Sequence, residues 1–209
     1  MAKQVRLALF GASGAGKSTT CRLILDAVQR QGRTGAVVKL AEPLYDLQRL
    51  IYSLCGQPIA EPYRQDGMLL SSLADNFRRI DPESLTRLFA ARVADAENSN
   101  AEVVICDDVR RPDYEALRKM GFRFVRISAP DELRIRRRAE RGDLAPVSDQ
   151  HVAEVPISLA PDFEVLNDST IEHLARQVQA LTDVVAGTWQ SGLVAESPTT
   201  AGSIAGGAQ

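Results

Sequence analysis

Short apolar runs alternate along the chain with segments in which apolar residues recur three and four positions apart. The runs at 5–10, 35–41, 103–106, 122–127 and 163–166 have the length of strands, and the third is apolar throughout, as is typical of a buried parallel strand. Helical spacing covers 18–31, 44–55, 67–79, 83–98, 112–120, 130–141 and 171–185. This alternation predicts an α/β fold, with a parallel five-stranded sheet between two layers of helices in a three-layer sandwich.

Two stretches depart from simple alternation. The block 43–100, between the second and third strands, is mostly helical and too long for an ordinary crossover, so we expect a helical insert there. From 187 to 209 the residues are mostly Gly, Ser, Thr and Ala, which leaves little apolar surface to bury. We therefore predict one domain over 1–186 and a disordered tail over 187–209.

A phosphate-binding motif joins the first strand to the first helix. Residues 11–18 read GASGAGKS and fit the pattern G-x-x-x-x-G-K-[ST] at every fixed position. In such a loop the backbone N–H groups and the helix N-terminus hold phosphate oxygens, the lysine reaches the β- and γ-phosphates, and the hydroxyl binds Mg²⁺. The alternative is a glycine-rich turn that merely connects a strand to a helix. The motif predicts a P-loop NTPase fold and an ATP site made of Gly11, Ser13, Gly14, Ala15, Gly16, Lys17, Ser18 and Thr19.

Two consecutive acids follow the third strand directly. Asp107 and Asp108 stand where a carboxylate can face either the Mg²⁺ or the acceptor in enzymes with a phosphate loop. Only one of the two can point into the site, because successive side chains diverge. The alternative is a helix cap or a turn. We predict Ser18 and Asp107 as metal ligands and Asp108 as a catalytic, acceptor-binding residue.

Four arginines lie on one face of the helix predicted at 130–141. Arg134, Arg137, Arg138 and Arg141 are spaced i, i+3, i+4 and i+7, and like charges at these spacings repel unless an anion lies beside them. A lid over ATP, at about 130–150, would explain the pattern. In that case Arg134 and Arg138 act in catalysis, while Arg137 and Arg141 bind ATP. The alternative is an ordinary solvated helix.

Composition limits the remaining classes. A net charge of -2 disfavours a protein built to hold nucleic acid, although only four of the 25 basic residues are lysines. Three scattered cysteines and no long apolar run suggest a soluble protein of the reducing cytoplasm. Neither the guanine-reading motif Asn-Lys-x-Asp nor an Asp-x-x-Gly switch is present, which disfavours a GTPase. Further arginines in or after the insert could bind an anionic acceptor: Arg64, Arg78, Arg79, Arg87, Arg92, Arg110 and Arg111.

Several segments together resemble the phage-type deoxynucleoside monophosphate kinases. The run VVICDDVRRPDYE at 103–115 is similar to that family's strand–Asp-Val-Arg-x-Pro-Asn-Glu segment, and AEPL at 41–44 to its Ala-x-Pro-Leu step. The family's His-x-x-Glu and Asn-Asp-Gly-Thr stretches resemble 151–154 and 167–170. Three positions depart from the family pattern: Arg111, Asp113 and Ser169. The pair Arg110-Arg111 also resembles the animal-type phosphomevalonate kinases, which generally have an altered phosphate loop.

The resemblance implies transfer of a phosphoryl group from Mg-ATP to a nucleoside monophosphate, with the insert binding the acceptor. It places Asn167 near the adenine and implies an acceptor site that includes Arg64, Arg79, Asp108, Arg110 and Arg111. ATP and a small phosphorylated acceptor are the expected partners, without a membrane or stable nucleic-acid binding, and a homodimer is compatible with the sequence. Two alternatives stay open: a kinase of phosphomevalonate or of a hydroxyl acceptor, and a non-catalytic module that binds ATP.

Overall fold

A parallel sheet forms the centre of the molecule. The structure is a computed structural model that describes residues 4–60, 64–141, 144 and 160–191. Within these residues the strands are β1 (Val5–Phe10), β2 (Gly35–Val37), β3 (Val103–Cys106), β4 (Arg123–Ser128) and β5 (Phe163–Leu166). All pairs are parallel, and the strand order is β2-β3-β1-β4-β5. The carboxyl ends of the strands therefore share one edge, where ligands bind in open α/β sheets.

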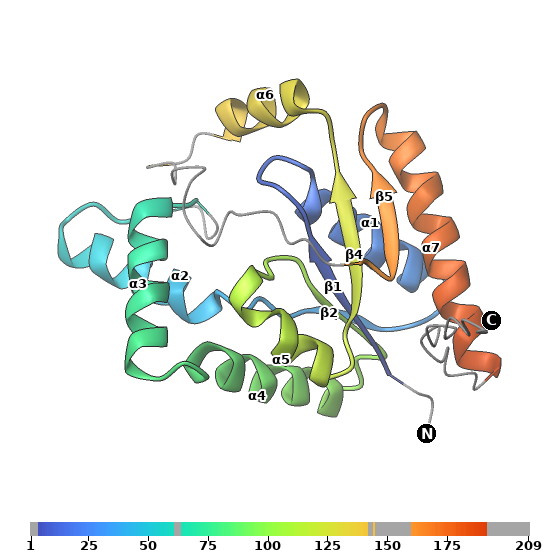
Figure 1. The fold of residues 1–209 in the computed structure, drawn as a ribbon, viewed down its shortest axis with the longest axis horizontal. Helices are drawn as coiled ribbons and strands as arrows, with labels where there is room; N and C mark the ends of the chain where they lie inside the picture. The colour runs from blue at the N-terminus through green and yellow to red at the C-terminus, as the bar shows by residue number, and fades with distance from the viewer. Residues whose placement is uncertain (1–3, 61–63, 142–143, 145–159, 192–209) are drawn as a thin grey trace, which may run out of the picture.

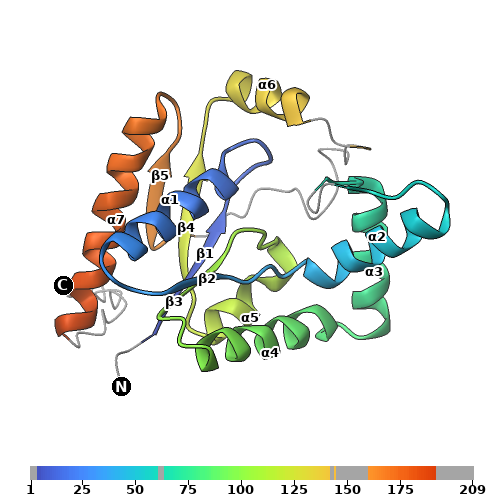
Figure 2. The same ribbon diagram turned by 180° about the vertical axis from the view of Figure 1, so that it is seen from behind.

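Helices cover both faces of the sheet (Figures 1 and 2). One face carries α1 (Lys17–Arg30) and α7 (Ile171–Ser191). The other carries α2 (Glu42–Leu54), α3 (Gly67–Ile80), α4 (Ser84–Asn98), the short 3-10 helix η1 (Arg111–Asp113) and α5 (Tyr114–Lys119). The remaining helix, α6 (Asp131–Arg141), lies over the loop between β1 and α1. The predicted three-layer α/β architecture is confirmed.

The alternation of side chains along β1 explains how the sheet joins two cores. Leu7 and Leu9 point into the cluster formed with α1 and α7. Ala8 and Phe10 point into the cluster formed with α4 and α5, where Phe10 contacts Phe124 edge to face. Because both faces are buried, the strand is apolar at nearly every position, as the parallel arrangement requires.

Most predicted elements agree with the structure to within one or two residues, and three boundaries do not. The strand predicted at 35–41 ends at Val37, because the backbone N–H groups of Leu40 and Ala41 turn to the Asp108 carboxylate. The helix predicted at 112–120 is divided into η1 and α5. The last helix runs to Ser191 and not to 185, so 187–191 belong to a helix: one glycine costs only about 1 kcal/mol within it.

Part of the predicted lid and tail lies outside the described residues. This applies to 145–159, which include His151 and Glu154, to 192–209, and to the side chain of Arg141. Among the helices that the structure describes, none has both the length and the apolar character needed to cross a membrane.

Candidate functional site

The loop between β1 and α1 is pressed against other backbone segments. Gly14 and Gly16 have φ angles of 81° and 99°, which side-chain-bearing residues rarely adopt. A Cβ on Gly14 would lie 2.5 Å from the carbonyl oxygen of Arg134, and one on Gly16 would lie 2.1 Å from Nδ2 of Asn167. Both glycines are therefore needed for conformation and for space. The loop has the strand-to-helix setting that the phosphate-binding motif requires.

Lys17 and Ser18 begin α1 at this loop. The Lys17 ammonium donates hydrogen bonds to the carbonyl oxygens of Gly11 (2.8 Å) and Ala12 (3.2 Å), which hold it over the loop. Ser18 is exposed in the first helical turn, whereas Thr20 is buried and donates to the Gly16 carbonyl at 3.0 Å. Of these two hydroxyl groups, it is Ser18 that remains accessible to a ligand.

The helix α6 brings two of its predicted arginines to the loop. Arg134 donates to the carbonyl oxygen of Ser13 at 3.4 Å and pairs with Asp131 at 2.7 Å. Arg137 donates to Asn167 through both terminal nitrogens, at 3.3 Å to Oδ1 and 3.5 Å to the carbonyl oxygen. Arg138 is half-buried on the same helix. The predicted arginine face is thus directed toward the phosphate loop at Arg134 and Arg137.

A buried ion pair lies at the carboxyl end of β3. Lys39 donates to Asp107 at 2.6 Å, and the side chain of Asp107 is only 3% exposed. Burial alone lowers the pKa of Lys39, but the charge and hydrogen bond of Asp107, with the charge of Asp108, raise it above its ordinary value. Ser18, at the start of α1, and Asp107, directly after β3, both lie at the carboxyl edge of the sheet, and their role as metal ligands stays a prediction.

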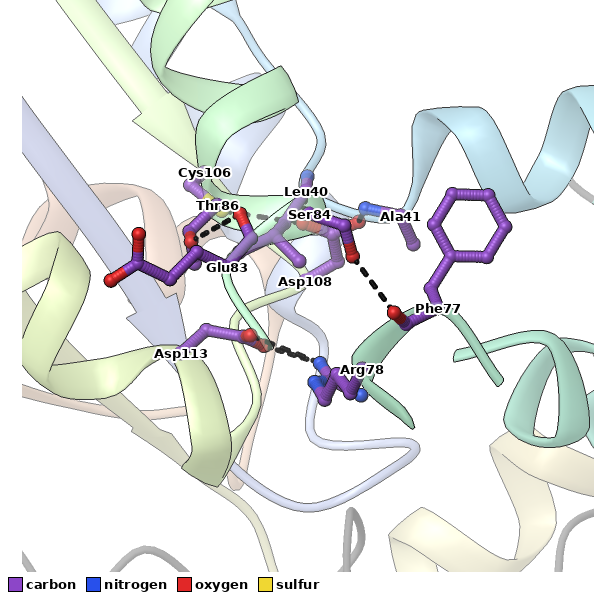
Figure 3. A network of polar contacts seen from close by, with 10 residues as sticks. All are labelled: Leu40, Ala41, Phe77, Arg78, Glu83, Ser84, Thr86, Cys106, Asp108 and Asp113. Carbon is purple, nitrogen blue, oxygen red and sulfur yellow. Dashed lines mark hydrogen bonds and ion pairs between the residues drawn. The ribbon is translucent and has the colours of Figure 1, made fainter. Parts of the chain in front are cut away.

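Asp108 points away from this pair and into the backbone. Its two oxygens accept hydrogen bonds from the N–H groups of Leu40 (2.8 Å) and Ala41 (3.0 Å), as Figure 3 shows. The Cys106 thiol lies 3.2 Å from the same carboxylate. Asp108 thus fixes the chain where it leaves β2, and the two consecutive acids diverge as expected. Its catalytic role stays a prediction.

A second ion pair connects the insert to the segment after β3. Nη2 of Arg78, near the end of α3, lies 3.0 Å from each carboxylate oxygen of Asp113 in η1 (Figure 3). The exposed fractions of the two side chains are 20% and 3%. Burial raises the pKa of Asp113, although the Arg78 charge opposes this shift. The charge of Asp108 also raises the pKa of Asp113, and the charge of Arg110 lowers it.

The other predicted acceptor-binding arginines differ in setting. Arg79 is exposed, and its guanidinium donates a hydrogen bond of 3.3 Å to Asn76 on its own helix. Arg111 is exposed in η1, and Arg110 is half-buried beside it. Arg64 is exposed, and its carbonyl oxygen accepts a hydrogen bond from the buried Gln48 at 2.8 Å. The structure therefore brings Arg110 close to Asp113 and leaves Arg79 on the surface.

The sequence analysis missed three residues of this region, Lys39, Gln48 and Asp113 as the partner of Arg78, and it named Arg78 only as one of seven arginines that could bind an anion. Lys39 carried a usable indication, because it is one of four lysines and lies two residues before the AEPL segment. Arg78 could not be separated from Arg79 by residue type. The helical phase that directs one inward and the other outward depends on packing against neighbouring helices.

Known proteins match in fold. No family model matches the sequence, and no curated protein matches it. The solved structure of TT1252 from Thermus thermophilus is 21% identical, with 88% of this chain and 98% of that chain covered at a TM-score of 0.51. A candidate kinase from Chloroflexus aurantiacus is 14% identical over 90% and 98% of the two chains, at a TM-score of 0.50. The APS kinase CysC from Mycobacterium tuberculosis, solved with AMPPNP and APS, is 16% identical over 89% and 99%, at 0.49.

The first two likenesses extend over 88% and 90% of this chain. At this level of identity they show the fold. The chain has the P-loop NTPase fold, in the three-layer form with a parallel five-stranded sheet.

Proposed function

We propose that the protein is an ATP-dependent phosphotransferase whose acceptor carries an ionised phosphate. The first choice of acceptor is a nucleoside monophosphate, in particular a deoxynucleoside monophosphate. The observation that carries the proposal is the complete phosphate loop with arginines of α6 against it. Arg134 reaches Ser13 and Arg137 reaches Asn167 beside Gly16, so positive charge faces the loop from a second element. Phosphoryl transfer depends mainly on positioning and on neutralising phosphate charge, which such an arrangement supplies.

The donor side follows from the loop. Lys17 would exchange its two carbonyl partners for the β- and γ-phosphates of ATP, since those bonds already hold the ammonium over the loop. Mg²⁺ fits the donor set, because Ser18 offers an exposed hydroxyl and Asp107 a carboxylate, which in this structure is paired with Lys39 at 2.6 Å. Bound there with the nucleotide, Mg²⁺ would neutralise phosphate charge.

The acceptor class follows from the carboxylates at the strand edge. A hydroxyl acceptor needs a general base that is able to take its proton. Asp107 is engaged by Lys39, and Asp108 by two backbone N–H groups. A phosphate monoester has a second pKa of about 6, so its oxygen is already an anion at neutral pH and needs no base. This favours a phosphorylated acceptor over a hydroxyl compound.

Arginines would hold that acceptor. Guanidinium groups bind phosphate through two parallel hydrogen bonds. We place Arg64 and Arg110 in the acceptor site and add Arg78, because Asp113 already fixes its guanidinium in a half-buried position. Arg79 and Arg111, both exposed, remain predictions of the sequence. The resemblance to deoxynucleoside monophosphate kinases supports a nucleotide acceptor.

The test is release of ADP from Mg-ATP with a panel of acceptors. The panel holds the common ribo- and deoxyribonucleoside monophosphates, phosphomevalonate and, as hydroxyl acceptors, the matching nucleosides. The Lys17→Ala variant is the control for turnover at this site. Turnover with one or a few monophosphates, lost in the variant, is expected. Turnover with nucleosides alone would contradict the acceptor class, and ATP binding without any turnover would favour the non-catalytic alternative.

A further inference from the structure

We propose that Asn167 is a positioning residue that sets Arg137 of α6 against the phosphate loop before the nucleotide binds. The inference rests on the proposed function in one respect, namely that the loop binds ATP. It does not depend on the identity of the acceptor. It assigns Asn167 the role of positioning an arginine of the protein itself. This role differs from the adenine contact that the family resemblance implies.

The side chain of Asn167 contacts both the loop and the helix. Nδ2 donates to the carbonyl oxygen of Ala15 at 2.9 Å, and Oδ1 accepts from Nη2 of Arg137 at 3.3 Å. The carbonyl oxygen of Asn167 lies 3.5 Å from Nη1 of Arg137. Its backbone N–H donates to Ser128 at 2.7 Å, which anchors the residue to the end of β4. The residue as a whole is only 7% exposed.

An amide is the side chain that satisfies both neighbours. The carbonyl oxygen of Ala15 needs a donor and the Arg137 guanidinium needs an acceptor, and the Asn167 side chain presents one of each. Rotating the amide by half a turn would oppose oxygen to oxygen at Ala15 and nitrogen to nitrogen at Arg137, so its orientation is fixed by both partners. Nδ2 also lies only 2.1 Å from the place that a Cβ on Gly16 would take, so a side chain at Gly16 would displace it.

This contact holds Arg137 before the nucleotide arrives. A long side chain loses rotamer entropy when it is immobilised by a ligand, which costs about 0.5–1.5 kcal/mol on binding. Because Asn167 holds both terminal nitrogens of Arg137 at the loop, much of this ordering is present in the free protein. Shortening Asn167 removes the Oδ1 contact and keeps that of the backbone carbonyl, so it should weaken nucleotide binding through Arg137 and by no more than loss of Arg137 itself.

A double-mutant cycle measured by calorimetry with Mg-ATP tests the inference. The variants are Asn167→Ala, Arg137→Ala and the double variant. We expect Arg137→Ala to weaken ATP binding about tenfold, which corresponds to one charge-assisted hydrogen bond, and Asn167→Ala to weaken it by no more than that. The double variant should bind no more weakly than Arg137→Ala. A double variant in which the two single effects multiply in full would overturn the inference.

Two further variants separate positioning from general support of the fold. Gln177→Ala is the matched control, because the Gln177 amide also bridges the end of β5, with bonds of 2.7 and 3.0 Å to Leu166, but belongs to α7. We expect it to bind ATP within about twofold of the natural protein. Asn167→Leu has about the same size but offers Arg137 no acceptor. It should weaken ATP binding by about the same factor as Asn167→Ala, and unchanged affinity would overturn the inference.

The outcomes also separate this inference from the proposed function. If the natural protein does not bind Mg-ATP, the proposed function and the inference both fail. If it binds and the cycle is multiplicative, only the inference fails. Asn167→Leu can replace Asn167→Ala in the cycle if the alanine variant does not fold.

Discussion

Replacing Arg78 by methionine would leave the Asp113 carboxylate buried without its cation. In the natural protein Nη2 of Arg78 lies 3.0 Å from both carboxylate oxygens, and the Asp113 side chain is 3% exposed. Methionine fills a similar volume, so the main effect is electrostatic and not a cavity. The variant therefore measures what a buried aspartate costs in this region.

The size of the effect follows from burial. Removing one partner of a buried ion pair typically costs 3–5 kcal/mol, and we expect about 3 kcal/mol here because a fifth of the Arg78 side chain is exposed. The loss of stability cannot exceed the free energy of protonating the buried carboxyl group. If Asp113 has the ordinary pKa of aspartate in the unfolded chain, that free energy is about 4 kcal/mol at pH 7 and about 1.5 kcal/mol at pH 5.

The sign of the pH dependence follows from the pKa of Asp113. Burial already raises this pKa in the natural protein, and removing Arg78, whose charge lowers it, raises it further. A carboxyl group with a raised pKa in the folded state binds protons more tightly there than in the unfolded chain. Its contribution to stability is therefore present at low pH and lost as the pH rises through the raised pKa. The variant should be closest to the natural protein at acid pH and most destabilised at pH 7.

Urea unfolding at pH 5 and pH 7 measures both effects, with Arg79→Met as the matched control. Arg79 lies in the same last turn of α3, so both variants remove one favourable charge from the helix end, but Arg79 is exposed and hydrogen-bonds to Asn76 of its own helix. The control should lose no more than about 0.5 kcal/mol. Adding Asp113→Leu to Arg78→Met should restore much of the stability. Equal losses for the two arginines, or a loss independent of pH, would refute the reasoning.

Two other predictions concern the strand edge and the thiols. Asp108→Ala would leave the N–H groups of Leu40 and Ala41 without their acceptor, so we expect a loss of about 2–4 kcal/mol by chemical denaturation, and unchanged stability would contradict the role assigned to this carboxylate. Ellman's reagent at pH 8 should titrate one thiol rapidly, that of the exposed Cys55, and three after unfolding, since Cys21 and Cys106 are buried. Burial raises the pKa of Cys21 to about 12, so unfolded thiols ionise first and the folded state should lose stability as the pH rises from about 9 to 12. Rapid reaction of all three thiols in the folded protein would contradict this burial.

The fold class could be predicted from the sequence because the spacing of apolar residues within each segment marks most of the strands and helices. The strands predicted at 103–106 and 163–166 agree with the structure to the residue. The second strand was predicted four residues too long, and the cause is a distant residue: Asp108 draws the backbone at Leu40 and Ala41 out of the sheet. Strand order also depends on contacts between segments far apart in the sequence, so the pattern could not supply it.

The site shows a sharper limit, at pairs of identical neighbours. The sequence identifies Asp107 and Asp108 as chemically relevant, and Arg78 and Arg79 as available cations. In each pair the two side chains point in different directions, because the backbone turns by about 180° per residue in a strand and about 100° in a helix. Which member faces the site depends on the phase of the whole element. That phase is set by packing, which the residue types do not record.

The phosphate loop illustrates the reverse case, in which a local motif reflects contacts with distant elements. Gly16 is a fixed position and Gly14 a variable position of a pattern that is usually explained by the approach of phosphate to the backbone. In this structure each also makes room for another element, α6 at Arg134 and the end of β5 at Asn167. The loop is thus held from two sides before any ligand is bound, and the same small residues that admit phosphate also admit the groups that orient charge toward it. A substitution at Gly16 would therefore disturb Asn167 and Arg137 together with the loop, so its effect on nucleotide binding cannot be assigned to lost loop flexibility alone.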